Sequence, residues 1–234
     1  RGVDHLDPDR LGADLAYTLD GGGRDVLYTE TFFAARARLS VEGEMVHPGY
    51  AKDRMVNALR IVAEFVAALP EAESPEHTEG REGYFYPHRS PEASSHRAAL
   101  DVLLRDFTAE GLDRRKALIE RQADYLQRRY ADAGIELEIE DQYENMGVYI
   151  DELEPRAITV AQRAAEAMGL ELRLDHVRGG TDGSRLSARG LPTPNVFTGG
   201  HAFHSRKEWN TVQNLERALA FTEALVYAWG EEAT

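Results

Sequence analysis

The sequence predicts an α/β protein in which a compact βαββαβ domain, residues 31–144, interrupts an α/β sheet domain built from residues 1–30 and 145–234. Two observations carry this prediction. Through the middle of the chain the hydrophobic period changes between 2, typical of half-buried strands, and 3.6, typical of amphipathic helices. After the middle part, helical segments alternate with short apolar strands, as in a sheet covered by helices. Because no internal repeat or low-complexity segment is present, the organisation is read from these changes of period.

The middle domain is expected to contain four strands and two helices. One helix is expected over Met55–Leu69, where apolar residues recur at spacings of three and four and Pro70 ends the pattern. A second helical period runs through LDRRKALIERQADYLQRRYADAG and stops at Gly134. Strands are assigned to FFAARARLSVEGEMVH, GYFYPHR, SSHRAALDVLLRDF and IELEIEDQY. This order is the split ferredoxin-like arrangement, a four-stranded antiparallel sheet with two helices on one face.

The flanking segments are expected to form a sheet of about three strands. An apolar run ends at Asp20 and three glycines, as a strand does at a tight turn. The other two strands are assigned to LELRLDHV and PNVFTGG, and helices to PRAITVAQRAAEAMG, SRLSARG and TVQNLERALAFTEALVYAWG. Three strands would leave much apolar surface exposed, so we expect this sheet to be incomplete.

Composition narrows the class of partner. The chain has 27 Lys and Arg against 41 Asp and Glu, a formal net charge of -14, which argues against nucleic acid or an anionic membrane and favours a small molecule or peptide. The absence of cysteine excludes disulfides, thiolate zinc sites and Cys nucleophiles, so any metal is held by His and carboxylate. No apolar run approaches the roughly 18 to 20 residues of a membrane span. We expect a cytoplasmic protein.

The candidate metal-binding and substrate-binding residues of the flanking segments lie in two loops and at one strand end. In GGHAFHSRKEW, His204 has His201 three residues before it and Glu208 four residues after it. Asp20 ends a strand, and RGGTDG, which begins at Arg178, opens a helix after another strand. In a parallel α/β sheet these segments would meet at the carboxyl ends of the strands, where ligands bind. The alternatives are a turn aspartate for Asp20 and an ordinary surface histidine for His204.

Two candidates lie in the middle domain. His47 ends its first strand in VHPGYAK, where a simple Pro-Gly turn is the alternative. Arg105 lies in the alternating strand LDVLLRDF, where it is either a residue of the solvent face or an anion binder.

In combination, these motifs resemble the peptidase T branch of the di-zinc metallopeptidases, the tripeptide aminopeptidases. The match runs in order through AYTLDGGG, VHPGYAK, MVNAL, LLRDF, IEDQYENM, RGGTDG, LPTPN and the His204 loop. The resemblance implies a catalytic α/β domain interrupted by a ferredoxin-like lid that forms a homodimer. It also implies two zinc ions per active site and release of the N-terminal residue from a tripeptide.

The resemblance also implies roles for individual residues. Asp20 matches a ligand of one zinc and His204 a ligand of the second, whereas His201 is not implied as a ligand. His47 matches the lid histidine that reaches the partner subunit's active site and stabilises the oxyanion. Three residues match polar groups that hold the substrate's carbonyl or carboxylate: Arg105, Asn57 and Arg178.

The family's His-x-Asp ligand pair, its bridging Asp and its Glu-Glu pair, which includes the general base, have no counterpart in this sequence. Arg1 and Gly2 resemble the last two residues of the family's stretch around that base, so the N-terminal half of the catalytic domain is expected to be missing. We therefore expect the chain alone to bind zinc weakly, if at all, and to lack peptidase activity. The alternatives are another enzyme of the same clan (a dipeptidase, carboxypeptidase or deacylase), a dimerisation module, or the second half of a longer gene product.

Overall fold

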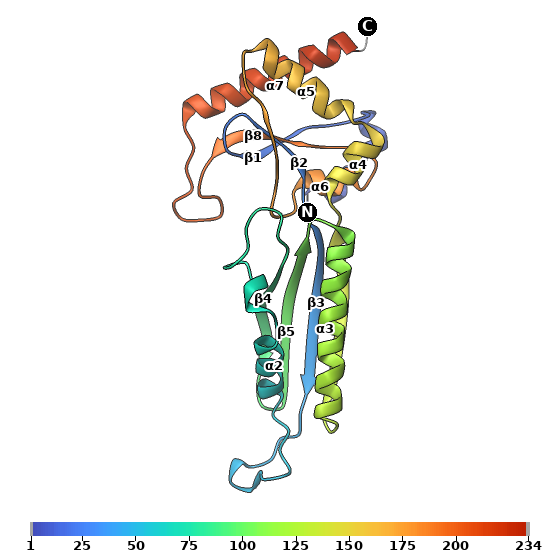
Figure 1. Ribbon diagram of the computed structural model, residues 1–234, viewed down its shortest axis with the longest axis vertical. Coiled ribbons are helices and arrows are strands. Elements are labelled where there is room, and N and C mark those ends of the chain that lie inside the picture. The colour runs from blue at the N-terminus through green and yellow to red at the C-terminus, as the bar shows by residue number, and fades with distance from the viewer. Residues whose placement is uncertain (1, 233–234) are drawn as a thin grey trace. The chain divides into compact units, whose positions relative to one another are not determined.

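A computed structural model describes residues 2–232 and divides into two compact units (Figure 1). Phe33–Gln142 form one of them, which we call the insert unit. The described residues on either side form the other, which we call the flanking unit. Each unit has its own sheet and its own buried apolar core, and each is described by itself.

The insert unit has the βαββαβ order that the sequence predicts. Its sheet has the strand order β4-β5-β3-β6, and β5 pairs antiparallel with both β3 and β4. The pairing of β3 with β5 is regular over ten residues, from Phe33 opposite Asp106 to Glu42 opposite Arg97. The ferredoxin-like prediction is therefore confirmed. Its elements are β3 (Phe33–Glu42), α2 (Ala58–Ala67), β4 (Tyr84–Ala93), β5 (Arg97–Asp106), α3 (Ala109–Arg129) and β6 (Gly134–Tyr143).

Alternation along the strands separates the two faces of this sheet. On β3, Ala35, Ala37, Leu39 and Val41 are buried in the core of the insert unit, because successive side chains of a strand point to opposite faces. Arg36, between two of these residues, instead forms an ion pair with an acidic side chain of β6. One face of the sheet is therefore apolar and packs against α2 and α3, while ion pairs cross the other.

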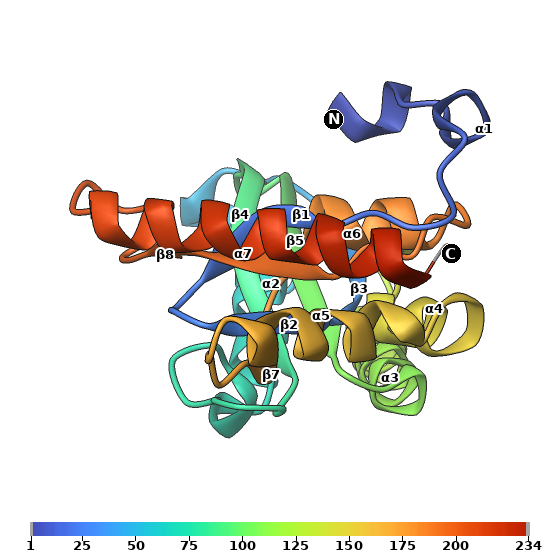
Figure 2. The ribbon, with the colours of Figure 1, turned by 90° about the horizontal axis from the view of Figure 1, so that it is seen from above.

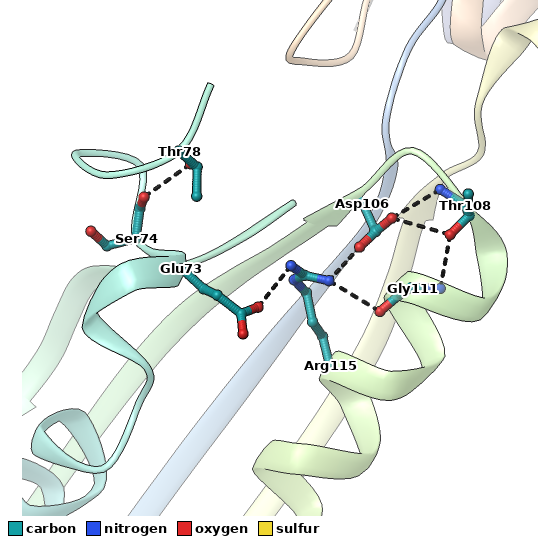
Figure 3. A network of polar contacts seen from close by, with 7 residues as sticks. All are labelled: Glu73, Ser74, Thr78, Asp106, Thr108, Gly111 and Arg115. Atoms are coloured by element: carbon teal, nitrogen blue, oxygen red, sulfur yellow. Dashed lines mark hydrogen bonds and ion pairs between the residues drawn. The ribbon is translucent and has the colours of Figure 1, made fainter. Parts of the chain in front are cut away.

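A buried arginine joins α3 to the end of β5 and to the segment after α2 (Figure 3). Arg115 donates from Nη1 to Asp106 and from Nη2 to Oε2 of Glu73, the latter over 2.8 Å. Asp106 also accepts from the backbone N–H of Thr108, the N-cap of α3, over 3.0 Å. The guanidinium lies 5.4 Å from the centre of the Phe85 ring. Arg115 thus holds two loops against the core with its charge paired.

The flanking unit contains a sheet of four strands in the order β1-β8-β2-β7. The strand that the sequence did not predict is β2, which is only five residues long and is separated from β3 by two residues. Helix α4 was also missed. The elements are η1 (Gly2–His5), α1 (Pro8–Leu11), β1 (Thr18–Gly22), β2 (Val26–Glu30), α4 (Met146–Leu153), α5 (Arg156–Ala167), β7 (Arg173–His176), α6 (Asp182–Ser187), β8 (Asn195–Gly200) and α7 (Val212–Glu232).

The direction of the strands corrects a second expectation. β1 is parallel to β8 and β2 is parallel to β7, but β2 and β8 are antiparallel, so the sheet is mixed rather than parallel. The turn between β1 and β2 reverses the chain, with Gly23 and Asp25 at φ 64° and 58°. The carboxyl end of β7 therefore lies at one end of the strands, and the carboxyl ends of β1 and β8 lie at the other.

Two helices cover one face of this sheet and lie side by side over it (Figure 2). Helix α7 packs on β8 and helix α5 on β2. Their shared core includes Phe197 of β8 and Phe221 of α7, whose ring centres are 5.5 Å apart. Across residues 2–232 no helix combines the length and the apolar character needed to cross a membrane.

Candidate functional site

Three segments of the flanking unit meet around one pocket of about 460 Å³. Asp20 contributes from β1, His204 from the loop after β8, and Gly180, Thr181 and Asp182 from the start of α6. The two predicted zinc ligands thus line the same pocket, together with the RGGTDG loop. Their assignment as ligands stays a prediction.

The reason for this convergence differs from the one expected. Because β7 runs antiparallel to β1 and β8, the loop after β7 leaves the sheet at the end opposite to the carboxyl ends of β1 and β8. Instead, the start of α6 is held by a capping box, in which Thr181 Oγ1 accepts from the N–H of Ser184 and Ser184 Oγ accepts from the N–H of Thr181. Ser184 Oγ also donates to Thr31 Oγ1, just beyond β2, over 3.0 Å. These bonds fix Asp182 beside the pocket.

A buried hydrogen-bond network also surrounds the points where the chain leaves and re-enters the flanking unit. Asn145 Oδ1 accepts from the N–H of Thr31 over 3.0 Å and from that of Gly147 over 2.9 Å. Thr31 Oγ1 accepts from the N–H of Met146 over 3.0 Å, in addition to the Ser184 hydroxyl. This network ties β2, α4 and α6 together, and no sequence motif predicted it.

The pocket contains two acidic side chains, Asp20 and Asp182, and one histidine, His204. Burial raises the pKa of Asp20, the negative charge of Asp182 raises it further, and His204 opposes both effects. Within residues 2–232, no hydrogen bond or ion pair engages the side chains of these three residues. Asp182 was not singled out from the sequence, where it was only one letter of a glycine-rich loop. The pocket therefore presents two carboxylates and one imidazole to a ligand and favours a cation.

The His204 loop has an unusual backbone. His204 has φ 61°, a left-handed conformation that is uncommon outside glycine. Its N–H donates to Oε2 of Glu208 over 2.9 Å, so Glu208 is a structural partner of the loop. His201 instead stacks on Trp209, with ring centres 4.4 Å apart, and pairs with it through the backbone. The two histidines of the motif therefore have separate environments.

Two glycines allow this loop to fold back onto the sheet. A Cβ atom on Gly22 would lie 2.8 Å from the Phe203 ring, and one on Gly200 would lie 2.7 Å from it. The contact places the residue before His204 against the ends of β1 and β8. Larger residues at either glycine would push the loop away.

The described side chains do not form a complete metal site by themselves. Residues 2–232 contain no group of three or more His, Asp or Glu side chains arranged to do so. A protein zinc site needs three or four ligands. The chain's own residues therefore do not fit a complete zinc site, although Asp20 and His204 are side chains of the types that zinc accepts.

The other residue predicted to bind substrate in this unit is Arg178. Its guanidinium lies 5.4 Å from the centre of the Phe32 ring, a cation–π distance. It is two residues before Gly180, which lines the pocket. Its role in substrate binding stays a prediction.

The remaining three predicted site residues lie in the insert unit. His47 is exposed, and its Nδ1 accepts from the N–H of Gly49 over 3.1 Å. Arg105 is buried and donates from Nη1 to the backbone oxygens of Ala35 and Leu104, over 3.0 and 2.8 Å. Its Nη2 donates to Gln142 over 2.9 Å. These bonds give Arg105 a structural role in the sheet. Its predicted role in binding the substrate stays a prediction.

Asn57 is the N-cap of α2, where its Oδ1 accepts from the N–H of Arg60 over 3.3 Å. We expect Asn57→Ala to lower the free energy of unfolding of the insert unit by about 1 kcal/mol, because the cap bond is lost. Asn57→Asp retains the acceptor and should unfold within a few tenths of a kcal/mol of the wild type. Urea denaturation followed by circular dichroism measures both. Equal losses in the two variants would show that the cap is not what stabilises α2.

Comparison with known proteins agrees with this architecture. Residues 29–133 match the peptidase dimerisation domain of the M20 type. The chain is 46% identical over 219 residues to peptidase T of Halothermothrix orenii and 45% identical over 218 residues to that of Clostridium botulinum. These alignments cover 94% and 93% of the chain but 53% of each relative, so the chain spans about half the length of the curated relatives it matches.

Solved structures show the same fold. Aminopeptidase PepT from Bacillus cereus matches with a TM-score of 0.78 at 20% identity, over 97% of this chain and 60% of that one. A tripeptidase from Staphylococcus aureus matches with the same TM-score at 18% identity. The fold thus defines the class, an α/β protein with two sheets in which residues 29–133 match an M20 peptidase dimerisation domain. More particularly, the chain is a homologue of peptidase T over the half of those proteins that it covers.

Proposed function

We propose that this chain forms part of a zinc-dependent aminopeptidase that releases the N-terminal residue of tripeptides. The observation that carries the proposal is the pocket of the flanking unit, where Asp20, Asp182 and His204 converge without partners of their own. The identity to peptidase T across nearly the whole chain supports the substrate class.

In this proposal the two units have different roles in the enzyme. Residues 1–30 and 145–234 are segments of the catalytic domain, and residues 31–144 are the lid and dimerisation domain. The match to the peptidase dimerisation domain supports the second assignment. Asp20 and His204 each supply one zinc ligand, and the other ligands and the general base come from polypeptide outside the described residues.

The remaining assignments concern the substrate. His47 would stabilise the developing oxyanion in the partner subunit, because positioned donors stabilise such charge most strongly in a closed site. Arg178, Arg105 and Asn57 would hold the carbonyl or carboxylate groups of the peptide. For Arg105 and Asn57 this role would have to coexist with the structural bonds described above.

The experiment is reconstitution of activity. The purified chain with zinc and a tripeptide should release no amino acid, whereas co-expression with the part of Halothermothrix orenii peptidase T that the chain does not span should give zinc-dependent release. In that complex His204→Ala should lower kcat/KM at least ~100-fold, because loss of a metal ligand exceeds the loss of its supporting partners. His201→Ala, three residues away, is the matched control and should retain most of the activity.

Three outcomes would contradict the proposal. Hydrolysis by the chain alone would place a complete site within it. Cleavage of N-acyl amino acids in place of tripeptides by the complex would identify a deacylase of the same clan. Loss of activity in His201→Ala but not in His204→Ala would overturn the ligand assignment.

A second candidate function is that of a dimerisation module without chemistry of its own, which the match over residues 29–133 favours. Sedimentation of the intact chain addresses dimerisation directly. A concentration-dependent dimer is expected. A monomer at high micromolar concentration would count against both a module and a homodimeric enzyme.

A further inference from the structure

The segment between β3 and α2 projects from the insert unit beyond the end of β3 (Figure 1). We call residues 43–56 of this segment the arm. His47 lies in the arm, at the N-cap of the short turn Pro48–Tyr50, and is exposed. Its Nδ1 accepts from the N–H of Gly49, so the proton of the neutral ring is on Nε2. The turn therefore fixes which nitrogen of His47 donates, while the base of the arm decides where that donor lies.

The base of the arm is attached to the hairpin turn between β4 and β5. The N–H of Gly43 donates to the backbone oxygen of His96 over 2.7 Å. Just beyond the other end of the arm, the N–H of Ala58 donates to the backbone oxygen of Ser95 over 2.9 Å. In the described part of the chain, the arm forms hydrogen bonds outside itself only with His96.

The side chain of His96 adds a second bond to the same residue of the arm. Its Nδ1 lies 3.0 Å from the backbone oxygen of Gly43. Because a carbonyl oxygen only accepts, Nδ1 of His96 carries the proton and donates. Its Nε2 lies 3.7 Å from Oε1 of Glu42, which also accepts from Arg97 over 3.0 Å. His96 thus bonds both backbone groups of Gly43, at the point where the chain leaves β3.

The two ends of the arm lie against each other. The N–H of Val56 donates to the backbone oxygen of Glu44 over 3.0 Å. A Cβ atom on Gly43 would lie only 2.1 Å from the backbone oxygen of Val56, so no side chain fits between the two ends. A shift of Gly43 would therefore move both ends of the arm together.

We propose that His96 is a positioning residue for His47. Its two bonds to Gly43 set the direction in which the arm leaves the sheet, and through it the place of the Nε2–H donor of His47. The inference rests on the proposed function, in which His47 stabilises the oxyanion in the partner subunit. A small misplacement of such a group reduces the rate strongly, because the transition state must be met in a precise geometry. His96 touches no substrate and acts through His47.

The first test is kinetic and uses the complex with the unspanned part of Halothermothrix orenii peptidase T. His96→Ala should lower kcat at least ~10-fold and change KM less than ~3-fold, because an oxyanion donor acts in the transition state. His96→Asn keeps an N–H donor close to the position of Nδ1 and should restore most of kcat. In a His47→Ala background, His96→Ala should cause no further loss, since its effect passes through His47.

His77 supplies the matched control for these variants. It is an exposed histidine of the same unit, and its Nδ1 lies 2.9 Å from Oγ of Ser74 in the segment after α2. His77→Ala therefore also removes a hydrogen-bonded imidazole, but one without contact to the arm, and should leave kcat unchanged.

The second test is hydrogen exchange in the chain alone, which requires no peptidase activity. The N–H groups of Gly43 and Val56 should exchange at least ~10-fold faster in His96→Ala than in the wild type, because the base of the arm opens more often. Exchange in His96→Asn should stay close to that of the wild type. Thermal melting of each variant shows whether the fold is retained.

Several results would overturn the proposal. These are an unchanged kcat in His96→Ala, a further loss from His96→Ala in the His47→Ala background, and equal losses in His96→Asn and His96→Ala. If no complex hydrolyses tripeptides, the proposed function fails and exchange alone decides on the arm. Faster exchange in His96→Ala would then uphold the attachment of the arm by His96, and unchanged exchange would refute it.

Discussion

Replacing Arg115 with alanine should lower the free energy of unfolding of the insert unit by about 3–5 kcal/mol. The substitution removes the cation from the network of Figure 3 and leaves the buried carboxylate of Asp106 without its partner. It also releases Glu73, so the segment after α2 loses its attachment to α3. Urea denaturation followed by circular dichroism, which reports the helices of this unit, measures the loss.

Arg36 offers the matched control. It forms an ion pair with Glu140 over 2.6 Å, but both side chains are substantially exposed, so Arg36→Ala should cost about 1 kcal/mol or less. The comparison separates burial from ion pairing as the source of stability. Equal losses for Arg115→Ala and Arg36→Ala would contradict the buried network.

The second large effect is expected at Asn145. Asn145→Ala removes the oxygen that accepts from the buried N–H groups of Thr31 and Gly147, and should lower the free energy of unfolding of the flanking unit by about 2–4 kcal/mol. Both tryptophans, Trp209 and Trp229, lie in this unit, so tryptophan fluorescence follows its unfolding separately.

The half-buried N-cap Asn57 is the comparison for this substitution, since it has the same side chain and a capping role in the insert unit. Asn57→Ala should leave the tryptophan transition unchanged, whereas Asn145→Ala should move it to lower urea concentration. A tryptophan transition that does not move in Asn145→Ala would show that the network around Thr31 contributes little.

The insert unit could be predicted from the sequence because its strands have one face on the core and one face toward solvent. The alternation in β3 between small apolar residues and arginines is a direct consequence. Helix α3 covers most of the predicted helical period but ends at Arg129, before Gly134, which begins β6. The flanking sheet was harder to predict. Strand β2 is short, and its pairing with both β7 and β8 is a long-range contact that no local period records. Helix α4 likewise begins at Asn145 and Met146, whose hydrogen bonds to Thr31 join segments that are distant in sequence.

The candidate site was predicted in part, and for a reason that needed correction. Asp20 and His204 were identified as candidates from their motifs, and they line one pocket. The expected cause, a shared carboxyl edge of a parallel sheet, was wrong because β7 runs opposite to β8. The place of Asp182 beside Asp20 follows from the anchoring of α6 to Thr31, so its contribution to the pocket could not be read from local sequence.

In the proposed enzyme, this chain holds only part of the zinc site. Isothermal titration of zinc into the purified chain, with no second polypeptide present, tests it most directly. We predict no site with a Kd below ~10 µM, because Asp20 and His204 are fewer than the three or four ligands that zinc requires. Stoichiometric binding at submicromolar Kd, lost in His204→Ala, would contradict the account and show that the chain completes the site by itself.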